Sequence, residues 1–249
     1  MLAIIGGSGL GSLSALESAR EVNIVTPYGE PSAPLRVGRL NNRDIVFLPR
    51  HGENHRLPPH RINYRANVWA LHEQGVKNIV AVATVGGIGA GFGTGTLAIP
   101  DQIIDYTWGR AATYFDGEGG ESAVKHIDFT QPYCETLRVR LTRAAQRAGE
   151  TVHAGGAYAA TQGPRLETAA EITRMARDGA DMVGMTGMPE AALARELGLC
   201  YATLAVVVNA AAGTGASATG IDLPQAETLG RALMARVIKI LTEVMADGD

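Results

Sequence analysis

The chain has 249 residues, of which 46% are hydrophobic and 19% are charged, and its formal net charge at pH 7 is −3. This length can bury one sizeable core, so we expect a single domain over residues 1–249. The slightly acidic balance gives no basic surface for nucleic acid. No apolar run approaches the roughly 20 residues that a membrane-spanning helix needs, so we expect no membrane partner.

Cysteine usage and the first residues bear on the compartment. Cys134 and Cys200 lie far apart and match no metal-binding spacing, so they indicate neither a disulfide framework nor a zinc site. The apolar run Leu2 to Ile5 stops at Gly6 and no basic stretch precedes it, which is unlike a secretory signal. We therefore expect the protein in the cytoplasm.

The first predicted elements are strands. Leu2 to Ile5 is a short apolar run followed by a glycine-rich turn, which is typical of a buried strand. Two further strands, 35–40 and 44–48, flank Asn41-Asn42. Because asparagine tolerates positive φ, this pair predicts a hairpin.

The middle of the chain alternates helices and strands. Helical spacing of apolar residues covers 62–74 and 137–148, and a glycine follows each stretch as a C-terminal cap. A buried strand, 78–85, lies between them. Thr168 and Glu171 form a capping-box pattern that predicts the start of another helix.

The last third continues this alternation. We expect a strand over 180–185, a helix from Pro189 to Gly198, a strand over 201–208 and a long helix that opens at Asp222. Strands that are apolar on both faces indicate an α/β fold with a central sheet covered by helices on both sides. The polar, glycine-rich segment Gly117–Ser122 is the best candidate for a mobile loop.

Four predicted strands end in glycine or polar residues. The segments are Gly6-Gly7-Ser8-Gly9, Arg50-His51, Thr84-Val85-Gly86-Gly87 and Met185-Thr186. Ligands of open α/β sheets bind beyond the carboxyl ends of strands. Backbone N–H groups, hydroxyls, a guanidinium and an imidazole suit a phosphate ion. For Arg50-His51 alone, a basic surface loop is the simpler interpretation.

Two other ligand classes fit less well. The segment Gly7-Ser8-Gly9-Leu10-Gly11 lacks the dinucleotide-binding spacing, because position 12 is a serine. His51, His55 and His60 are separated by two prolines and have no cysteine or carboxylate cluster beside them. We therefore expect neither a Rossmann cofactor nor a metal.

Thr161–Thr168 and Asn209 are further candidates for chemistry. Glu167 stands beside the predicted helix cap, where its simplest role is electrostatic, in the first helical turn. Asn209 ends a buried strand, where its simplest role is that of a structural amide. For each residue taken alone, the structural role is favoured.

Several motifs together resemble the trimeric purine nucleoside phosphorylases, and most closely the methylthioadenosine phosphorylase branch. They are Gly6-Gly7-Ser8-Gly9-Leu10, Arg50-His51-Gly52, residues 63–71, Gly163-Pro164-Arg165 and Gly184-Met185-Thr186. The similarity runs from residue 3 to about residue 240. It implies a single-domain nucleoside phosphorylase-like fold, a homotrimer and phosphorolysis of a purine nucleoside, with inorganic phosphate as co-substrate and no metal or organic cofactor.

The resemblance also implies roles for individual residues. The phosphate shell would consist of Ser8, Arg50, His51, Thr84 through its backbone amide, and Thr186. Met185 would contact the ribose through its backbone. His126 would reach the 5′ group in the neighbouring subunit's site, although an ordinary partly buried histidine is an equally good interpretation. Asn209 and His51 would act in catalysis.

The base site departs from the methylthioadenosine branch. That branch usually has two aspartates where this chain has Asn209 and Ala211, and a small hydroxyl residue where it has Glu167. An ionised Glu167 only accepts hydrogen bonds, so it suits the N1–H of a 6-oxopurine and opposes adenine N1. The combination resembles the S-methyl-5′-thioinosine phosphorylases.

The 5′ side is expected to be apolar. Ile221 and Leu223 would cover a methylthio group, with His126 and Leu166 beside them. Such a pocket discriminates by only about 1–3 kcal/mol per methylene, so inosine is a plausible weaker substrate. The alternatives are a methylthioadenosine phosphorylase, a broader inosine or guanosine phosphorylase and, from another class, a non-catalytic purine-binding protein.

Overall fold

The computed structural model describes the chain except residues 8–9, 11–12, 14, 118–123 and 247–249. The phosphate ligand predicted at Ser8 lies outside the described residues. The same holds for the predicted mobile loop Gly117–Ser122, apart from its first residue.

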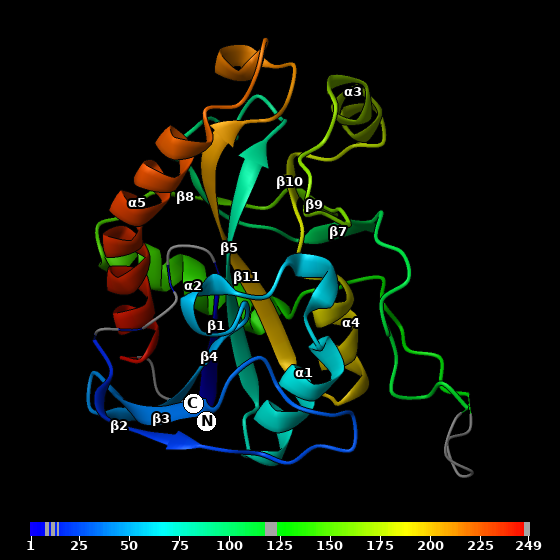
Figure 1. Cartoon of the computed structure of the whole chain (residues 1–249). Helices are drawn as coiled ribbons and strands as arrows, with labels where there is room; N and C mark the ends of the chain where they lie inside the picture. Colours follow the sequence, from blue (N-terminus) through cyan, green and yellow to red (C-terminus); the bar gives the residue numbers. More distant parts are fainter. Residues whose placement is uncertain (8–9, 11–12, 14, 118–123, 247–249) are drawn as a thin grey trace.

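Eleven strands of the described chain form one mixed sheet (Figure 1). In chain order they are β1 (Leu2–Gly6), β2 (Glu17–Val22), β3 (Leu35–Leu40), β4 (Arg43–Pro49), β5 (Asn78–Gly87), β6 (Leu97–Ile99), β7 (Gln102–Asp105), β8 (Val152–Ala154), β9 (Ala157–Ala160), β10 (Met182–Gly184) and β11 (Cys200–Ala210). The strand order is β2-β3-β4-β1-β5-β10-β9-β7, and β11 pairs with both β5 and β6.

The direction of the strands decides where their ends meet. β1 runs parallel to β4 and β5, and β11 runs parallel to β5. The carboxyl ends of these four strands therefore lie at one edge of the sheet. β10 pairs antiparallel with the end of β5, Met182 facing Gly87 and Val183 facing Gly86, so the residues that follow β10 reach the same edge.

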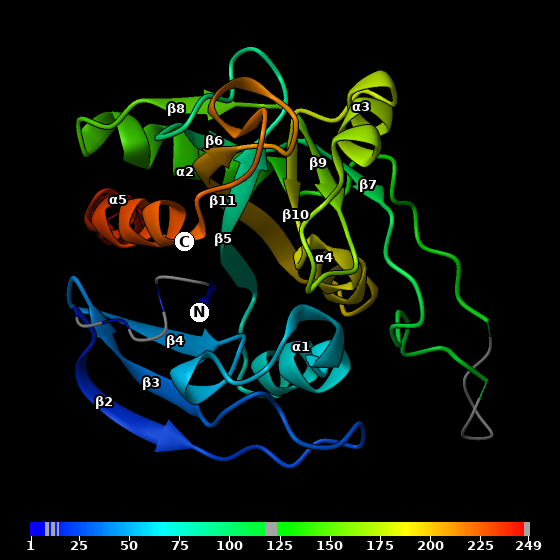
Figure 2. The ribbon, with the colours of Figure 1, turned by 45° about the horizontal axis from the view of Figure 1, so that its top comes forward.

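Helices cover both faces of the sheet, as Figure 2 shows. They are α1 (Tyr64–Glu73), α2 (Glu135–Arg147), α3 (Ala169–Arg177), α4 (Gly187–Glu196) and α5 (Leu223–Val244). One apolar core packs α1 and α4 against the sheet, and a second packs α2 and α5 against the opposite face. The expected α/β class with a central mixed sheet is confirmed.

Local signals in the sequence explain several element boundaries. Asn41 and Asn42 have φ of 52° and 60° and join β3 to its antiparallel partner β4, as the hairpin prediction required. The Thr168 side chain accepts from the Glu171 N–H and the Glu171 side chain accepts from the Thr168 N–H, which completes the capping box of α3. The Asp222 side chain caps α5.

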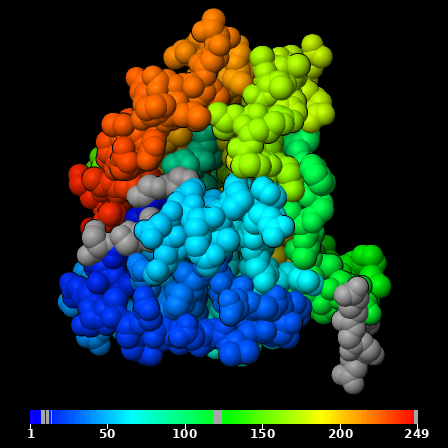
Figure 3. All heavy atoms as spheres, viewed as in Figure 1, coloured from blue at the N-terminus to red at the C-terminus, as the bar shows by residue number. Residues whose placement is uncertain are grey.

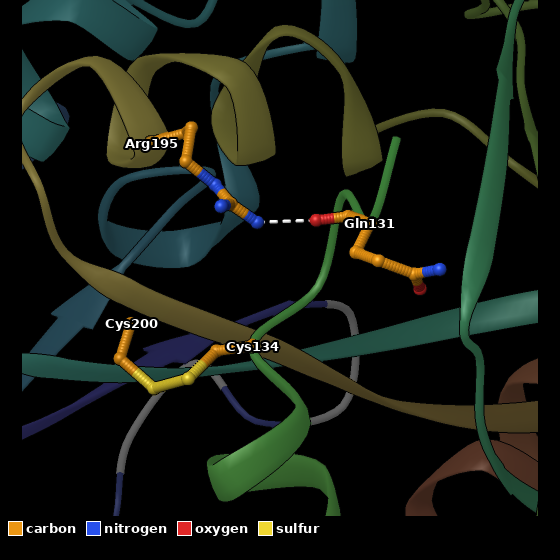
Figure 4. Close-up of a disulfide and its surroundings, with 4 residues drawn as sticks. All are labelled: Gln131, Cys134, Arg195 and Cys200. Carbon is orange, nitrogen blue, oxygen red and sulfur yellow. Dashed lines mark hydrogen bonds between the residues drawn. A yellow bond between two sulfur atoms is a disulfide. The ribbon is translucent and has the colours of Figure 1, made fainter. Parts of the chain in front are cut away.

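The expectation that the two cysteines stay unpaired was wrong. Cys134 precedes α2 and Cys200 begins β11, and the two are joined by a disulfide across a Cα–Cα distance of 5.2 Å (Figure 4). The Cys134 N–H also donates to the Tyr201 carbonyl at 2.8 Å. The fold brings the two residues together although 66 positions separate them, and no spacing rule in the sequence reports such a contact.

None of the described helices is both long enough and apolar enough to span a membrane.

Candidate functional site

A cavity of about 1260 Å³ opens at the edge where the strand ends meet. Figure 3 shows the surface hollowed there, between the segments coloured cyan, yellow-green and orange. The cavity is lined by most of the predicted site residues, which come from distant parts of the chain: Arg50, His51, Thr84, Leu166, Glu167, Met185, Thr186, Asn209, Ala211, Ile221 and Leu223. His126 is exposed and does not line this cavity.

Arg50 follows β4 and is held by a buried ion pair. Its Nε and Nη2 donate to the two carboxylate oxygens of Glu190 at 2.7 and 2.8 Å, and its Nη1 donates to the Val82 carbonyl at 3.2 Å. Arg50 is 1% exposed and Glu190 is fully buried. A guanidinium has five N–H donors, so two remain for a ligand in the cavity.

The environment of Arg50 keeps its guanidinium charged. Burial lowers the pKa of Arg50, but the charge of Glu190 and its hydrogen bonds outweigh burial, so the pKa is raised overall. Tyr201 on β11 donates its hydroxyl to Glu190 Oε1 at 2.9 Å. Glu190 therefore receives three hydrogen bonds, and the arginine is fixed before any ligand binds.

Gly7, after β1, allows the guanidinium to approach this closely. A Cβ atom at this position would lie 2.6 Å from the Val82 carbonyl oxygen and 3.1 Å from Arg50 Nη1. Any larger residue at position 7 would push the guanidinium out of its place. Gly7 thus leaves room for the arginine.

His51 is neutral at pH 7. Burial, and then the neighbouring charge of Arg50, lower its pKa to about 4. Nδ1 lies 2.8 Å from the Leu57 carbonyl, and since a carbonyl only accepts, Nδ1 carries the proton. Nε2 is then a hydrogen-bond acceptor. The ring also stacks on His55, with 4.0 Å between the ring centroids.

Thr186 is the residue that caps α4, and its side chain makes no capping hydrogen bond. Its hydroxyl therefore does not cap the helix, and Thr186 lines the cavity. Buried Tyr158 accepts from the Thr186 backbone N–H at 3.4 Å. Thr84, in β5, lines the cavity beside it. Arg50, His51, Thr84 and Thr186 together form what we call the anion wall.

Asn209 reaches the cavity because β11 contains a bulge. Val207 pairs with Val85 on β5 and Asn209 pairs with Gly86, so Val208 is an extra residue without a partner. Such a bulge changes the direction of the side chains that follow it. The Asn209 Nδ2 donates to the Ala210 carbonyl at 2.7 Å. Ala211, at the end of this segment, is 1% exposed.

Glu167 also lines the cavity and lies in the segment between β9 and α3. Thr161 Oγ1 donates to Glu167 Oε1 at 2.6 Å. Gly163 in the same segment has φ of 61°, and a Cβ atom there would collide with the Met185 sulfur. Glu167, Asn209, Leu166 and Ala211 form what we call the base wall.

The mouth of the cavity mixes apolar and charged residues. Ile221 is half-buried, whereas Leu223 and Leu166 are 58% and 37% exposed. In a single chain, these apolar side chains are therefore only partly covered by protein. Among the described residues, no group of three or more His, Cys, Asp or Glu side chains could hold a metal ion.

Sequence reasoning missed two residues that hold the site. Glu190 follows Pro189 at the start of a predicted helix, where a carboxylate is usually solvent-exposed, and nothing local separates it from such a residue. Arg110 lies in a segment for which no element was predicted. Its hydrogen bonds go to residues that are distant in the sequence.

Comparison with known proteins agrees with this geometry. Residues 1–243 match the phosphorylase superfamily. The chain is 56% identical to the probable S-methyl-5′-thioinosine phosphorylase of Xanthomonas campestris pv. campestris, over 86% of this chain and 85% of the relative. It is 49% identical to the 6-oxopurine nucleoside phosphorylase of Pyrococcus furiosus, over 85% and 80%.

Solved structures resemble the chain as well. A methylthioadenosine phosphorylase from Schistosoma mansoni in complex with adenine has a TM-score of 0.92 and 33% identity, with 98% of this chain and 90% of that chain covered. Sequence and structure comparisons thus give the same family by separate routes.

Proposed function

The chain belongs to the phosphorylase superfamily, and we propose that it cleaves S-methyl-5′-thioinosine with phosphate to hypoxanthine and 5-methylthioribose 1-phosphate. The observation that carries this proposal is that Glu167 and Asn209 line the same cavity as Arg50, His51 and Thr186. An acceptor and an amide thus face the base while cationic and hydroxyl groups face the anion.

Glu167 would read the protonated N1 of a 6-oxopurine. Thr161 occupies Oε1, so Oε2 is the oxygen that remains for N1–H. A carboxylate only accepts, so it pairs with N1–H and opposes the lone pair of adenine N1. Relatives named 6-oxopurine and S-methyl-5′-thioinosine phosphorylases support this assignment.

Asn209 would stabilise the departing base. One N–H of its Nδ2 already donates to the Ala210 carbonyl. The second N–H can donate to purine O6, and Oδ1 can accept from purine N7–H. As the C1′–N9 bond breaks, its electron pair passes into the purine ring and N7 takes up a proton from solvent, while the phosphate gives up its own proton to solvent as it becomes the sugar phosphate dianion. A contact that strengthens as this charge develops accelerates the chemical step.

Phosphate would attack C1′ from the anion wall. Arg50 donates to it from a fixed position, Thr186 and the Thr84 backbone N–H add further donors, and Ser8 completes the shell. Since Nε2 of neutral His51 is an acceptor, it can accept a hydrogen bond from the hydroxyl group of HPO₄²⁻. No metal or organic cofactor is required, because phosphate itself forms the new bond to C1′.

The assembly belongs to the proposal too. We expect a homotrimer in which His126 of one subunit covers the 5′ group in the next, while Ile221 and Leu223 line that part of the pocket from the subunit's own chain and the Met185 backbone contacts the ribose. This would complete a mouth that a single chain leaves partly open. Analytical ultracentrifugation gives the oligomeric state, and a monomer with full activity would contradict this role of His126.

The compartment is a further proposal. We place the protein in the cytoplasm, as a single catalytic domain over residues 1–249. A disulfide between Cys134 and Cys200 is uncommon in a reducing compartment. Rapid alkylation of cells followed by mass spectrometry measures the fraction of each cysteine that is a free thiol. If neither cysteine is alkylated, the disulfide is complete, which would argue for an oxidising location.

Ultraviolet-monitored cleavage of S-methyl-5′-thioinosine, S-methyl-5′-thioadenosine and inosine tests the function directly. We expect phosphate-dependent release of hypoxanthine, fastest from the first substrate and slower from inosine. Preferred release of adenine would favour a methylthioadenosine phosphorylase. No release from any substrate would support a purine-binding protein instead.

A further inference from the structure

The Arg110 guanidinium donates hydrogen bonds to two segments that carry cavity residues, one that precedes Glu167 and one that surrounds Thr186. It is half-buried and lies after β7. It does not line the cavity itself. Its contacts are nevertheless with backbone atoms directly beside residues that do.

One half of the guanidinium holds the segment that leads to the base wall. Nη2 donates to the carbonyls of Thr161 and Gln162 at 3.1 and 2.8 Å, and Nε donates to Gln162 Oε1 at 3.1 Å. Thr161 is the residue whose hydroxyl orients Glu167. The position of the carboxylate thus depends on backbone that Arg110 fixes.

The other half holds the segment that carries the anion-wall threonine. Nη1 donates to the carbonyls of Met185 and Met188 at 2.9 and 2.6 Å. These carbonyls stand on either side of Thr186, at the start of α4. Arg110 therefore ties the backbone on both sides of Thr186 to the backbone that precedes Glu167.

Tyr64 of α1 supports the guanidinium from below. Arg110 Cζ lies 5.3 Å from the ring centroid, which is a cation–π contact, and the Tyr64 hydroxyl accepts from Nη1 at 3.3 Å. The planar five-donor fork is the only side-chain group that can serve five acceptors at once. Lysine, with three donors, could hold one segment but not both.

We propose that Arg110 is a positioning residue that sets the distance between the phosphate subsite and the base subsite. Attack on C1′ requires phosphate and nucleoside to be aligned, and a displacement of about 1 Å can cost about 100-fold in rate. Arg110 touches neither ligand, so its effect passes through Thr186 and Glu167. This proposal rests on the proposed phosphorolysis.

The test compares R110M and R110K with wild type. We expect R110M to raise KM for both phosphate and nucleoside and to lower kcat/KM by about 100-fold, and R110K to recover part of that loss. R174M is the matched control, because Arg174 is an exposed arginine that contacts the Tyr106 ring and lies outside the cavity. Its kinetic constants should equal those of wild type.

The proposal is overturned if R110M lowers only the melting temperature while the constants per folded enzyme stay at wild-type values, or if only one ligand's KM changes. Should R110M not fold, R110K carries the test, and a rise in both KM values supports the proposal while unchanged values reject it. The substrate is whichever nucleoside the wild type cleaves. If it cleaves none, calorimetry compares the affinities of wild type and the same variants for phosphate and for hypoxanthine. Failure of the proposed function can therefore be told apart from failure of this proposal.

Discussion

The anion wall and the base wall of the cavity are held in different ways. On the anion wall, Arg50 is 1% exposed and is tied by two hydrogen bonds to fully buried Glu190. On the base wall, Glu167 and Asn209 are half-buried, and each makes one hydrogen bond to a neighbour in the chain: Glu167 to Thr161 and Asn209 to Ala210.

This difference separates two tasks. The anion wall is a part of the core, so its charges cannot change without loss of stability. The base wall sits on a strand end and on a loop before a helix, where a substitution alters hydrogen bonding without leaving a buried charge unpaired. We therefore expect that a base preference can be changed by a few substitutions while phosphate binding is preserved.

Redesign of the base wall is the largest expected effect. In the variant combining E167S with N209D, a hydroxyl that can donate to N1 and an acceptor for a 6-amino group replace the present pair. We expect the preference between S-methyl-5′-thioinosine and S-methyl-5′-thioadenosine to move toward the latter by up to about 10⁴-fold, because unmatched buried groups cost that much. Ratios of kcat/KM measure it.

Adding A211D extends the same test. Ala211 is 1% exposed, so an aspartate there would be buried until an amino group pairs with it, and thermal stability must be measured beside activity. The KM for phosphate should stay near its wild-type value throughout. An unchanged ratio of the two substrates in both variants would reject the base-wall assignment.

Glu-to-Gln exchange compares the two walls directly. E190Q removes the buried charge that balances Arg50, and we expect the free energy of unfolding to fall by about 3–5 kcal/mol. E167Q makes the same chemical change at a half-buried site, where we expect a change below about 1 kcal/mol together with impaired use of 6-oxopurine nucleosides. Urea unfolding of both variants checks this, and equal losses would contradict the distinction.

Truncation of Asn209 separates chemistry from anion binding. In N209A we expect kcat to fall by about 10²–10³-fold, as for other groups that stabilise developing charge, with little change in the KM for phosphate. Steady-state kinetics with both substrates varied give the two numbers. Equal losses in turnover and in phosphate affinity would mean that Asn209 maintains the structure of the whole cavity and does not act on the departing base alone.

The pH dependence of stability tests the neutral state of His51. Its pKa is lowered to about 4 in the folded protein, against about 6.5 unfolded. The unfolded chain therefore binds more protons between these values, and stability is lost as the pH falls from 6.5 toward 4. From pH 7 to pH 5 the loss from this group is about 2 kcal/mol.

Variant H51N isolates that contribution. Its amide does not titrate, so its unfolding free energy should fall less than that of wild type between pH 7 and pH 5, by about the same 2 kcal/mol. Chemical denaturation of wild type and of H51N at the two pH values measures the change in unfolding free energy of each protein. Equal pH dependences would mean that the pKa of His51 is the same in the folded and the unfolded protein, which would contradict the lowered pKa.

Strong local signals account for the parts of the fold that the sequence predicted. Asn41-Asn42 is a turn that few residue pairs can make, and Thr168 with Glu171 is a reciprocal cap. β2 was missed because its residues Glu17–Val22 are almost all exposed and charged or small, so no alternation of apolar residues marks it. β6 to β9 are only three or four residues long.

Within the site, the residues at strand ends could be predicted and those that support them could not. Arg50, Thr186 and Asn209 follow apolar strands, and the edge of a parallel sheet brings such ends together. Glu190 and Arg110 act through contacts to distant segments, and the disulfide of Cys134 and Cys200 joins segments 66 positions apart. These contacts exist only after the chain has folded.

The extra residue in β11 has a consequence for how the sequence can change. Up to Val207, the alternation of β11 is in phase with that of β5, and beyond it the two are offset by one. Loss of Val208 would leave Asn209 opposite Gly86 but remove the bulge that bends the strand and redirects the side chains after it. Exchange of one side chain for another at 209 leaves this bend in place, whereas loss of the one extra residue would change how an unaltered Asn209 enters the cavity.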